Sequence, residues 1–585
     1  MSQASPSPQS AKWPAMSIAE AHALLTAPGS PFEVEEIDVA GVRTRVWKNA
    51  PPAVRDIPVI ARAHGDKVFL VYEDERATFE SFFRAVSAFA RELQTAGVRK
   101  GDRIAIVMRN LPEWPVAFYA VQALGAIATP LNAWWTGPEL EYGLVDSGST
   151  VLIVDAERLE RLRAHLPNCR DLKRVYVSRA NEEISHPDIV ALESILGRTE
   201  AWADLPDQAL PDVRIEPEDP ATIFYTSGTT GKPKGALNTN RNVNCNVMTY
   251  ACAAARVFLR RGETPPEPDP KAPQRAMLLS VPFFHVTGCV AVLNPALASG
   301  AKLVTMRKWD PVRAFELIER EKITGAGGVP TIAWQLLEHP LRKNYDLSSL
   351  ESIAYGGAPS APELVRKIRE TFPNSAAGNG WGMTETTAAA TTHGAEDYDH
   401  RPDSAGPPAP VTDLKVMSVE GDRELSVGQV GELWCKGPQV VRAYWNKPEA
   451  SAQTFRDGWV RTGDLARLDE EGFVYIVDRA KDMLIRGGEN IYCIEVENVL
   501  YDHPAVMDAA LVGLPHKTLG EEPAAVVTLK PGAEVSEQAL RAFAAERVAA
   551  FKVPVRIVFR HEILPRNANG KIMKNELKKL FLADH

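Results

Sequence analysis

The chain has 585 residues, too many for one hydrophobic core, so its length predicts two or more domains. Its 45% hydrophobic and 24% charged residues are typical of a globular protein and argue against a disordered or fibrous chain. A formal net charge of −9 provides no basic surface for wrapping a nucleic acid, which excludes that class of partner.

Residues 1–60 are predicted to be an N-terminal leader and flank, with a disordered start. Met1–Met16 is rich in Ser, Pro and Gln and lacks an apolar core, which argues against a signal peptide. The six cysteines show neither paired metal spacing nor the density of a disulfide scaffold. A reducing compartment is therefore favoured, and we expect a cytoplasmic protein.

The most membrane-like stretch is Trp114–Trp135. Pro115, Gln122 and Gly125 are among the residues that interrupt it, so it predicts a buried helix running into a loop and not an integral membrane span. Peripheral contact with a membrane and a homodimer both remain open.

Residues 61–480 are predicted to form one large α/β domain. Thr78 begins a helical pattern with one apolar face, which ends at Gly97. Strand-like Ile104–Met108 and Val151–Asp155 follow on either side of the Trp114 segment. This alternation of helix and strand predicts a doubly wound sheet, with a small β-barrel-like subdomain later, from Leu414 to Tyr475.

A hydroxyl-rich and glycine-rich loop, Tyr225–Gly235, is predicted between the apolar run Ala221–Tyr225 and a helix-compatible segment. Its backbone N–H groups, hydroxyls and two lysines could together bind a phosphate. It is not a Walker motif, because Gly228 and Gly231 enclose only two residues and Pro233 replaces the magnesium-binding hydroxyl. A segment of this composition is most often a plain surface turn, so only further motifs elsewhere in the chain can favour a phosphate-binding loop.

Residues 481–585 are predicted to form a small mobile α+β domain. A charge cluster at Asp478–Met483 runs into the glycine pair of Arg486–Asn490, which is typical of a mobile junction between domains. Helix and strand patterns then alternate up to the loop Pro565–Lys571.

Several further motifs add candidate binding groups. Trp381 could stack on a flat base, and Glu385, four residues later, could hold a hard cation on phosphate oxygens. His285 lies beside two aromatic residues, where a lone histidine is more often a satisfied core group than a functional one. Gly356–Pro359 predicts a turn where the backbone approaches a ligand closely.

In order and spacing, these stretches resemble the adenylate-forming (AMP-binding) superfamily, of the acyl-CoA synthetase or fatty-acid–CoA ligase type. The resemblance is carried by seven motifs between Thr78 and Lys571, TSGTTGKPKG, PFFHVTG, YGGAP, NGWGMTET, RTGD, DRAKDMLIRGGEN and PRNANGK. It implies an α/β fold with a large N-terminal domain of doubly wound sheets, a small β-barrel-like subdomain and a small mobile α+β C-terminal domain.

The resemblance also implies two half-reactions at one site. A carboxylate attacks the α-phosphate of ATP, which releases pyrophosphate and leaves an acyl-adenylate. A thiol, normally that of CoA, then attacks the acyl carbonyl and releases AMP. ATP, Mg²⁺ and CoA are therefore the expected cofactor and co-substrates, and a small-molecule carboxylic acid is the expected substrate.

Residue roles follow from the same resemblance. It implies that the β- and γ-phosphates bind to Thr226, Ser227, Gly228, Thr229, Thr230 and Lys234. It implies that adenine binds to Gly357, Ala358, Asn379, Gly380 and Trp381. The α-phosphate is assigned to Thr384, magnesium to Glu385, and the ribose hydroxyls to Asp464 and Arg479.

The remaining implied roles concern the acid and the domain motion. Lys571 bridges the substrate carboxylate and the α-phosphate, and His285 flanks the acyl pocket. Lys481 is the hinge of the C-terminal domain, whose rotation withdraws Lys571 and brings Gly487 and Gly488 to form the thiol tunnel.

The acid itself is only weakly constrained. A neutral wall at Phe283 and Phe284, with no cation evident to receive a second carboxylate, favours a medium- or long-chain fatty acid. An aryl acid resembling benzoate or coumarate is the close alternative. The chain ends soon after Lys571, which favours free CoA over a fused carrier domain, and an acyl-AMP ligase that serves a separate carrier remains a further alternative.

Overall fold

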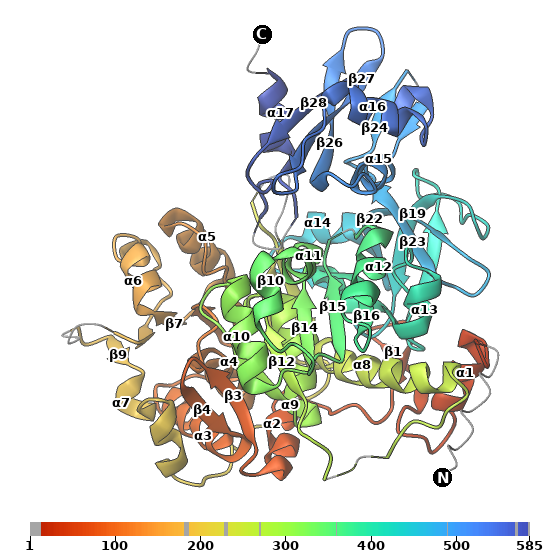
Figure 1. Cartoon of the computed structure of the whole chain (residues 1–585). Coiled ribbons are helices and arrows are strands. Elements are labelled where there is room, and N and C mark those ends of the chain that lie inside the picture. The colour runs from red at the N-terminus through yellow and green to blue at the C-terminus, as the bar shows by residue number, and fades with distance from the viewer. Residues whose placement is uncertain are drawn as a thin grey trace.

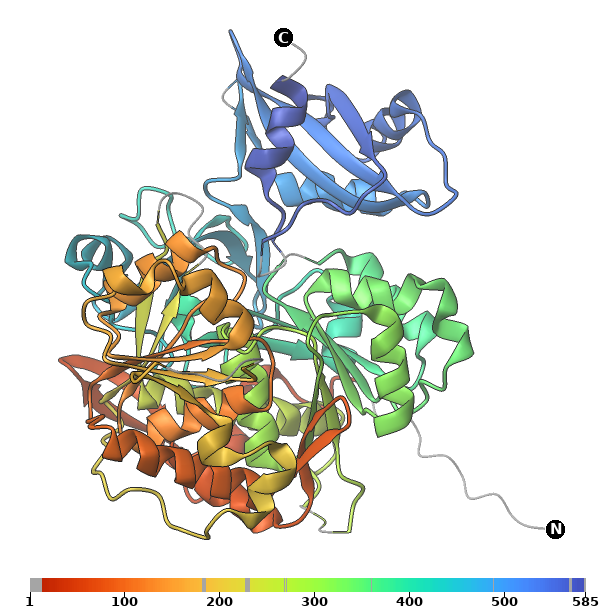
Figure 2. The ribbon, with the colours of Figure 1, turned by 90° about the vertical axis from the view of Figure 1, so that its left-hand side faces the viewer.

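The computed structural model describes residues 13–180, 186–226, 232–267, 269, 271–358, 360–487, 489–567 and 571–582. Figure 1 shows two large α/β layers below, a β-rich part at their side and a small C-terminal domain above them. In Figure 2 this C-terminal domain lies over the junction between the two large parts. No helix in these ranges is long and apolar enough to cross a lipid bilayer.

Two eight-stranded sheets, mostly parallel, form the large domain. In spatial order the first contains β20 (Ala443–Tyr444), β11 (Gly235–Thr239), β10 (Pro220–Tyr225), β6 (Ile127–Pro130), β5 (Arg103–Val107), β7 (Val151–Asp155), β8 (Arg174–Ser178) and β9 (Ile189–Ala191). The second contains β17 (Ala388–Gly394), β16 (Ala376–Met383), β15 (Ser352–Gly356), β14 (Gly325–Gly328), β12 (Ala276–Leu279), β13 (Lys302–Thr305), β3 (Val68–Tyr72) and β4 (Glu75–Thr78).

Helices cover these sheets and fill the space between them. In chain order they are α2 (Asp56–Ala61), α3 (Phe79–Thr95), α4 (Glu113–Ala123), α5 (Gly137–Ser147), α6 (Ala156–Leu162), α7 (Glu193–Leu196), α8 (Asn240–Arg260), α9 (Asn294–Ser299), α10 (Pro311–Glu321), α11 (Pro330–Glu338), α12 (Pro362–Thr371) and α13 (Ala395–His400). Upstream, α1 (Ile18–Leu25) packs on α8, and β1 (Val34–Val39) pairs with β2 (Val42–Trp47).

Two helices show how the sequence pattern produces the core. The Thr78 hydroxyl accepts a 3.0 Å bond from the Ser81 N–H and caps α3, as the pattern predicts. Every residue of α4 is buried, because it is enclosed between the two sheets. The apolar stretch from Trp114 therefore begins as a buried helix, as predicted, but it continues into the strand β6 where a loop was expected, because Ile127–Pro130 pairs with β5 and β10.

The glycine-rich loop differs from its prediction. It lies in a β-hairpin, because β11 pairs antiparallel with β10 immediately after the loop. The helix α8 begins only after β11, where the Thr239 hydroxyl accepts a hydrogen bond from the Asn242 N–H. The prediction of a helix-compatible segment directly after the loop is wrong, because residues 235–239 complete the sheet edge first.

The later part of the chain forms two smaller sheets. The β-rich subdomain has five antiparallel strands and one short helix, β18 (Asp413–Met417), β19 (Gly431–Lys436), α14 (Pro448–Thr454), β21 (Phe455–Arg456), β22 (Trp459–Leu468) and β23 (Val474–Arg479). The C-terminal domain contains β24 (Leu484–Arg486), β25 (Glu489–Ile491), α15 (Cys493–Tyr501), β26 (Val506–His516), β27 (Gly520–Leu529), α16 (Glu537–Ala545), β28 (Arg556–Arg560) and α17 (Lys574–Leu582).

Candidate active site

One cavity of about 900 Å³ is lined by both large sheets, the β-rich subdomain and the C-terminal domain. It brings together many predicted site residues, namely Thr226, Lys234, His285, Gly357, Asn379, Gly380, Trp381, Thr384, Glu385, Arg479, Lys481 and Lys571. These residues come from distant parts of the sequence and meet at one cavity. The base of the glycine-rich loop lies among them, which favours a binding role for the loop over that of a plain surface turn.

The other predicted residues lie elsewhere. Ala358, Asp464 and Gly487 are not among the described residues that line this cavity. Gly487 lies between β24 and β25 of the C-terminal sheet, where its N–H donates to the Leu519 carbonyl. The loop residues Ser227, Gly228, Thr229 and Thr230, and also Gly488, lie outside the described residues.

The two limbs of the glycine-rich loop are held at its base. The Thr226 N–H donates to the Lys234 carbonyl at 2.9 Å. The Tyr142 hydroxyl, from α5, donates to the Pro233 carbonyl at 2.9 Å. The Lys234 ammonium lies 4.3 Å from the ring centroid of Tyr444, which directs this charge along the cavity wall.

Glu385 sits on a single 3₁₀ turn, Thr384–Thr386, at the end of β16. Its carboxylate is buried, with 7% of the residue exposed, and accepts a 2.6 Å bond from the Tyr444 hydroxyl. Its own carbonyl accepts from the Val441 N–H at 3.0 Å. The sequence carries no signal for this tyrosine contact, because 59 residues separate the partners.

Trp381 connects the cavity to the β-rich subdomain. Its indole N–H donates to the Asp464 carboxylate at 2.8 Å, and the other oxygen of that carboxylate lies 3.2 Å from Arg479 Nε. Asp464 and Arg479 are cross-strand neighbours on β22 and β23. Asp464 therefore binds the Trp381 indole with one carboxylate oxygen and the Arg479 guanidinium with the other.

A glycine is required beside Trp381. A Cβ atom on Gly382 would lie only 1.6 Å from the Ala388 carbonyl oxygen, because β16 and β17 approach closely at a register shift. Any larger residue at position 382 would therefore push β17 away from β16.

Lys571 reaches the cavity from the C-terminal domain. Its backbone N–H donates to the Asn567 side chain at 3.0 Å, and the Asn567 N–H donates back to its carbonyl at 2.9 Å. Burial, followed by the nearby Arg479 charge, lowers the pKa of Lys571 to about 8, although Asp464 and Glu385 oppose this shift.

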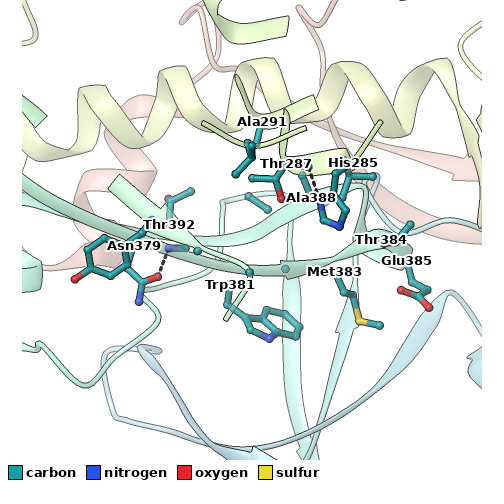
Figure 3. A pocket seen from close by; sticks show the side chains of 18 of the residues that line it. His285, Thr287, Ala291, Asn379, Trp381, Met383, Thr384, Glu385, Ala388 and Thr392 are labelled. Carbon is teal, nitrogen blue, oxygen red and sulfur yellow. Dashed lines mark hydrogen bonds between the residues drawn. The ribbon is translucent and has the colours of Figure 1, made fainter. Parts of the chain in front are cut away.

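His285 is a neutral group of the cavity wall. Its Nδ1 accepts from the Thr287 N–H at 3.3 Å, which places the ring proton on Nε2. Burial and then the Lys571 charge lower the pKa of His285 to about 4. Figure 3 shows His285 and Thr287 on one side of the β16–β17 pair and Trp381 on the other.

The wall beside His285 has a different composition from the predicted aromatic one. Phe283 is fully buried in the core, its ring 5.0 Å from that of Trp114, and neither it nor Phe284 lines the cavity. Phe283 packs against α4 in the core, whereas the buried ring of Phe284 lies edge-on to Trp134 at 6.0 Å. Instead the wall comprises α8, the π-helix Thr287–Leu293 and the glycine-rich strand β14.

Two α8 residues on this wall carry polar groups that the sequence analysis missed. Tyr250 and Arg256 both line the cavity. Arg256 places on the cavity wall a cation that the sequence motifs did not indicate. The two residues lie six positions apart on α8, about 120° apart around the helix, so helical spacing does not group them and the sequence does not tell which neighbours they meet.

Comparison with known proteins agrees with this architecture. The model of the AMP-binding enzyme family matches residues 58–445, and the model of the AMP-binding enzyme C-terminal domain matches residues 495–571. A long-chain-fatty-acid–CoA ligase of Bacillus subtilis (strain 168) is 35% identical over 539 residues, covering 89% of this chain and 93% of the ligase. A feruloyl-CoA synthase of an Amycolatopsis species is 34% identical, covering 86% of this chain and 94% of the synthase.

The fold is also that of a solved ligase. The crystal structure of the anthranilate CoA ligase AuaEII in complex with anthranoyl-AMP superposes with a TM-score of 0.80 and 26% identity, covering 92% of this chain and 98% of that one. The model of the AMP-binding enzyme family spans more than half of the chain, so the match establishes that the chain is a member of that family. The chain therefore belongs to the AMP-binding enzyme family, among the AMP-forming ligases that join a carboxylic acid to CoA through an acyl-adenylate.

Proposed function

We propose that this chain activates an acid with an apolar body, favouring a medium- or long-chain fatty acid, and transfers it to CoA. The observation that carries this proposal is the position of Lys571, which reaches the cavity that Thr384, Glu385 and His285 also line. A mobile ammonium and a carboxylate on one cavity are the groups that adenylate formation requires.

The nucleotide fits the half of the cavity around Trp381. We assign adenine to the cavity wall at Gly357, Asn379, Gly380 and Trp381, together with Ala358, which follows Gly357 but does not itself line the cavity. The ribose hydroxyls are assigned to Asp464 and Arg479, an acceptor and a donor already paired with each other. The triphosphate then extends toward Thr384 and the loop carrying Thr226, Ser227, Gly228, Thr229, Thr230 and Lys234.

The donor set at Glu385 fits a magnesium ion. Mg²⁺ prefers one or two carboxylates together with substrate phosphates, and a single buried carboxylate faces the predicted phosphate path. When bound, the ion neutralises phosphate charge. The Tyr444 hydroxyl holds the Glu385 carboxylate in position for this role.

The first half-reaction brings two negatively charged groups together, the acid carboxylate and the α-phosphate of ATP. The acid carboxylate attacks the α-phosphorus, and the bond from this phosphorus to the pyrophosphate bridging oxygen breaks. The Lys571 ammonium offsets the charge on both reacting groups, and Thr384 donates to an α-phosphate oxygen. Neutral His285 lines the acid side of the cavity without adding a charge of its own.

The second half-reaction requires Lys571 to leave. Lys481 lies on the cavity wall between β23 and β24, where the chain passes into the C-terminal domain. We propose that this domain turns at Lys481, withdraws Lys571 and presents Gly487 and Gly488 to the thiol. The CoA sulfur then attacks the acyl carbonyl, and AMP leaves with the bonding electrons.

An aryl acid is the second candidate, favoured by the small residues of β14. Ala326, Gly327 and Gly328 line the cavity, so this wall carries no side chain larger than a methyl group that would compete with a flat ring. The feruloyl-CoA synthase relative is consistent with this alternative.

A panel of fatty and aryl acids, scored for pyrophosphate release with and without CoA, tests the proposal. We expect apolar acids to give pyrophosphate, AMP and an acyl-CoA in equal amounts. Pyrophosphate release that ignores CoA and yields no thioester would instead establish an acyl-AMP ligase. Release with aryl acids alone would select the aryl-CoA ligase.

A further inference from the structure

The acid half of the cavity continues as a channel along α8. Tyr250, Ala253, Ala254 and Val257 line it, and their spacing places them on one face of the helix. Ala388, Ala389 and Thr392 of β17 also line the cavity. The two alanines of α8 keep the passage open, so an extended acyl group fits lengthwise.

The length of this channel follows from β17. Ala388 lies next to the turn that carries Thr384, and Thr392 lies four strand steps further on. At the usual rise of a strand, these positions are roughly 13 Å apart. The far end of the channel is therefore about one medium-length acyl chain away from the reacting carboxylate.

A guanidinium group closes this far end. Arg256 is 4% exposed and lines the cavity, and its Nη2 donates to the Thr392 carbonyl at 2.7 Å. Its Nη1 lies 3.3 Å from Nε2 of His22, which belongs to α1. The N-terminal helix thus seals the channel behind Arg256.

This guanidinium has no direct counter-ion. Within the described part of the chain, no carboxylate oxygen lies within 4.0 Å of Arg256, and its Nε has no hydrogen-bond partner. The nearby Asp397 carboxylate forms an ion pair with Arg260 instead, with 2.6 Å between Oδ1 and Nη2. A buried cation without an anion is costly, so an acceptor supplied by a ligand would stabilise it.

A second polar group faces the same channel. Tyr250 lines the cavity, and its hydroxyl makes no hydrogen bond to any residue that the structure describes. Burial alone raises the pKa of this phenol, so it remains a neutral donor. An acid that ends in a methyl group would leave the Arg256 guanidinium and the Tyr250 hydroxyl without a hydrogen-bond acceptor, so these groups do not suit a plain hydrocarbon chain.

We propose that the acid carries an oxygen acceptor, a carboxylate or a hydroxyl, at the end remote from the reacting carboxylate, and that Arg256 and Tyr250 bind it. The inference rests on the proposed function and narrows its substrate to ω-oxygenated acids with an apolar middle. Arg256 and Tyr250 are then specificity-determining residues.

The test compares acids of equal length. Decanoic acid, its terminal-hydroxy derivative and sebacic acid form one set, and cinnamic and 4-hydroxycinnamic acid form another. We expect kcat/KM for acyl-CoA formation to be at least about 10-fold higher for the oxygenated member of a set, because the plain member leaves the buried donors unpaired. Arg256→Met should bring this ratio toward unity, and Tyr250→Phe should reduce it.

Controls separate recognition from folding. Arg241→Met makes the same substitution on the first turn of α8, away from the cavity, and should keep the wild-type ratio. Equilibrium ATP binding by each variant reports an intact nucleotide site. Equal use of plain and oxygenated acids by the wild type, or a ratio that survives both substitutions, would overturn the inference. Absence of pyrophosphate release with every acid would overturn the proposed function as well.

Discussion

The Tyr444 hydroxyl donates a 2.6 Å hydrogen bond to the carboxylate of Glu385, and its ring lies under the Lys234 ammonium. One side chain thus links the carboxylate that we assign to magnesium with the lysine of the glycine-rich loop. Tyr444 lies on β20 at the edge of the first sheet, whereas Glu385 follows β16 of the second. The contact therefore ties the two sheets together at the phosphate path.

Tyr444→Phe should slow adenylate formation. The ring under Lys234 remains, but the buried Glu385 carboxylate loses a donor and no longer holds one orientation. We expect the rate of acid-dependent ATP–pyrophosphate exchange to fall about 10-fold, with more magnesium needed for half-maximal rate. Tyr475→Phe, which removes a hydroxyl bound to Asp469, is the matched control. Exchange and magnesium dependence equal to the wild type would contradict the role of Tyr444.

Lys571→Ala should separate the two half-reactions. In the proposed mechanism the ammonium acts only while the carboxylate attacks the α-phosphate, so adenylate formation should fall by about 100-fold or more. Thioester formation from synthetic acyl-adenylate and CoA should be spared, because that step follows withdrawal of the lysine. Rapid-quench measurement of each half-reaction checks this, and an equal loss in both would refute the assignment.

The pH dependence of adenylation should report the titration of Lys571. Its pKa is lowered to about 8, and the proposed role uses its protonated form, so kcat/KM should be level below this pH and fall as pH rises through it. Lys571→Arg keeps its charge at every accessible pH. This variant should be slower but should lack the alkaline decline, and a decline that persists unchanged would exclude Lys571 as its source.

His285 should contribute no break in the same profile. Its pKa is lowered to about 4, so the ring stays neutral through the neutral and alkaline range. His285→Gln, which retains a neutral hydrogen-bonding side chain, should therefore keep the shape of the profile. A changed alkaline decline in this variant would show that His285 also titrates there.

Lys481→Pro should block the thiol step. Proline fixes φ and removes the backbone donor, so it restricts the rotation that the hinge requires. We expect adenylate formation to continue and acyl transfer to CoA to fall by about 10-fold or more, as for other gating positions. Lys481→Ala, which keeps backbone freedom, is the control. Normal transfer from supplied adenylate by the proline variant would rule out this hinge.

Much of the fold follows from local pattern. The Thr78 cap, the buried α4 and the strand at Val151–Asp155 appear where apolar periodicity and turn residues place them. These features depend on residues a few positions apart, so the sequence reports them directly. The hairpin strand β11 was missed because Gly235–Thr239 is short and acquires its strand form by pairing with β10.

The site was predictable only in part. The motif order indicates that Trp381, Glu385 and Lys571 share one reaction, but not what holds them. The Trp381–Asp464 bond joins residues 83 positions apart, and its existence depends on how the β-rich subdomain meets β16. For Phe283 the sequence indicated a place on the substrate wall that the structure does not show. An aromatic side chain suits the core as well as a substrate wall, and only tertiary packing determines which of the two it joins.

Transfer of ¹⁸O from the acid to AMP tests the central claim most directly. The carboxylate attacks the α-phosphate, and cleavage by the thiol then leaves one former carboxylate oxygen on AMP. Turnover of an ¹⁸O-labelled acid with ATP and CoA should therefore give AMP with one ¹⁸O atom in its phosphate and unlabelled pyrophosphate. Unlabelled AMP, or formation of ADP with the label in inorganic phosphate, would contradict an acyl-adenylate mechanism.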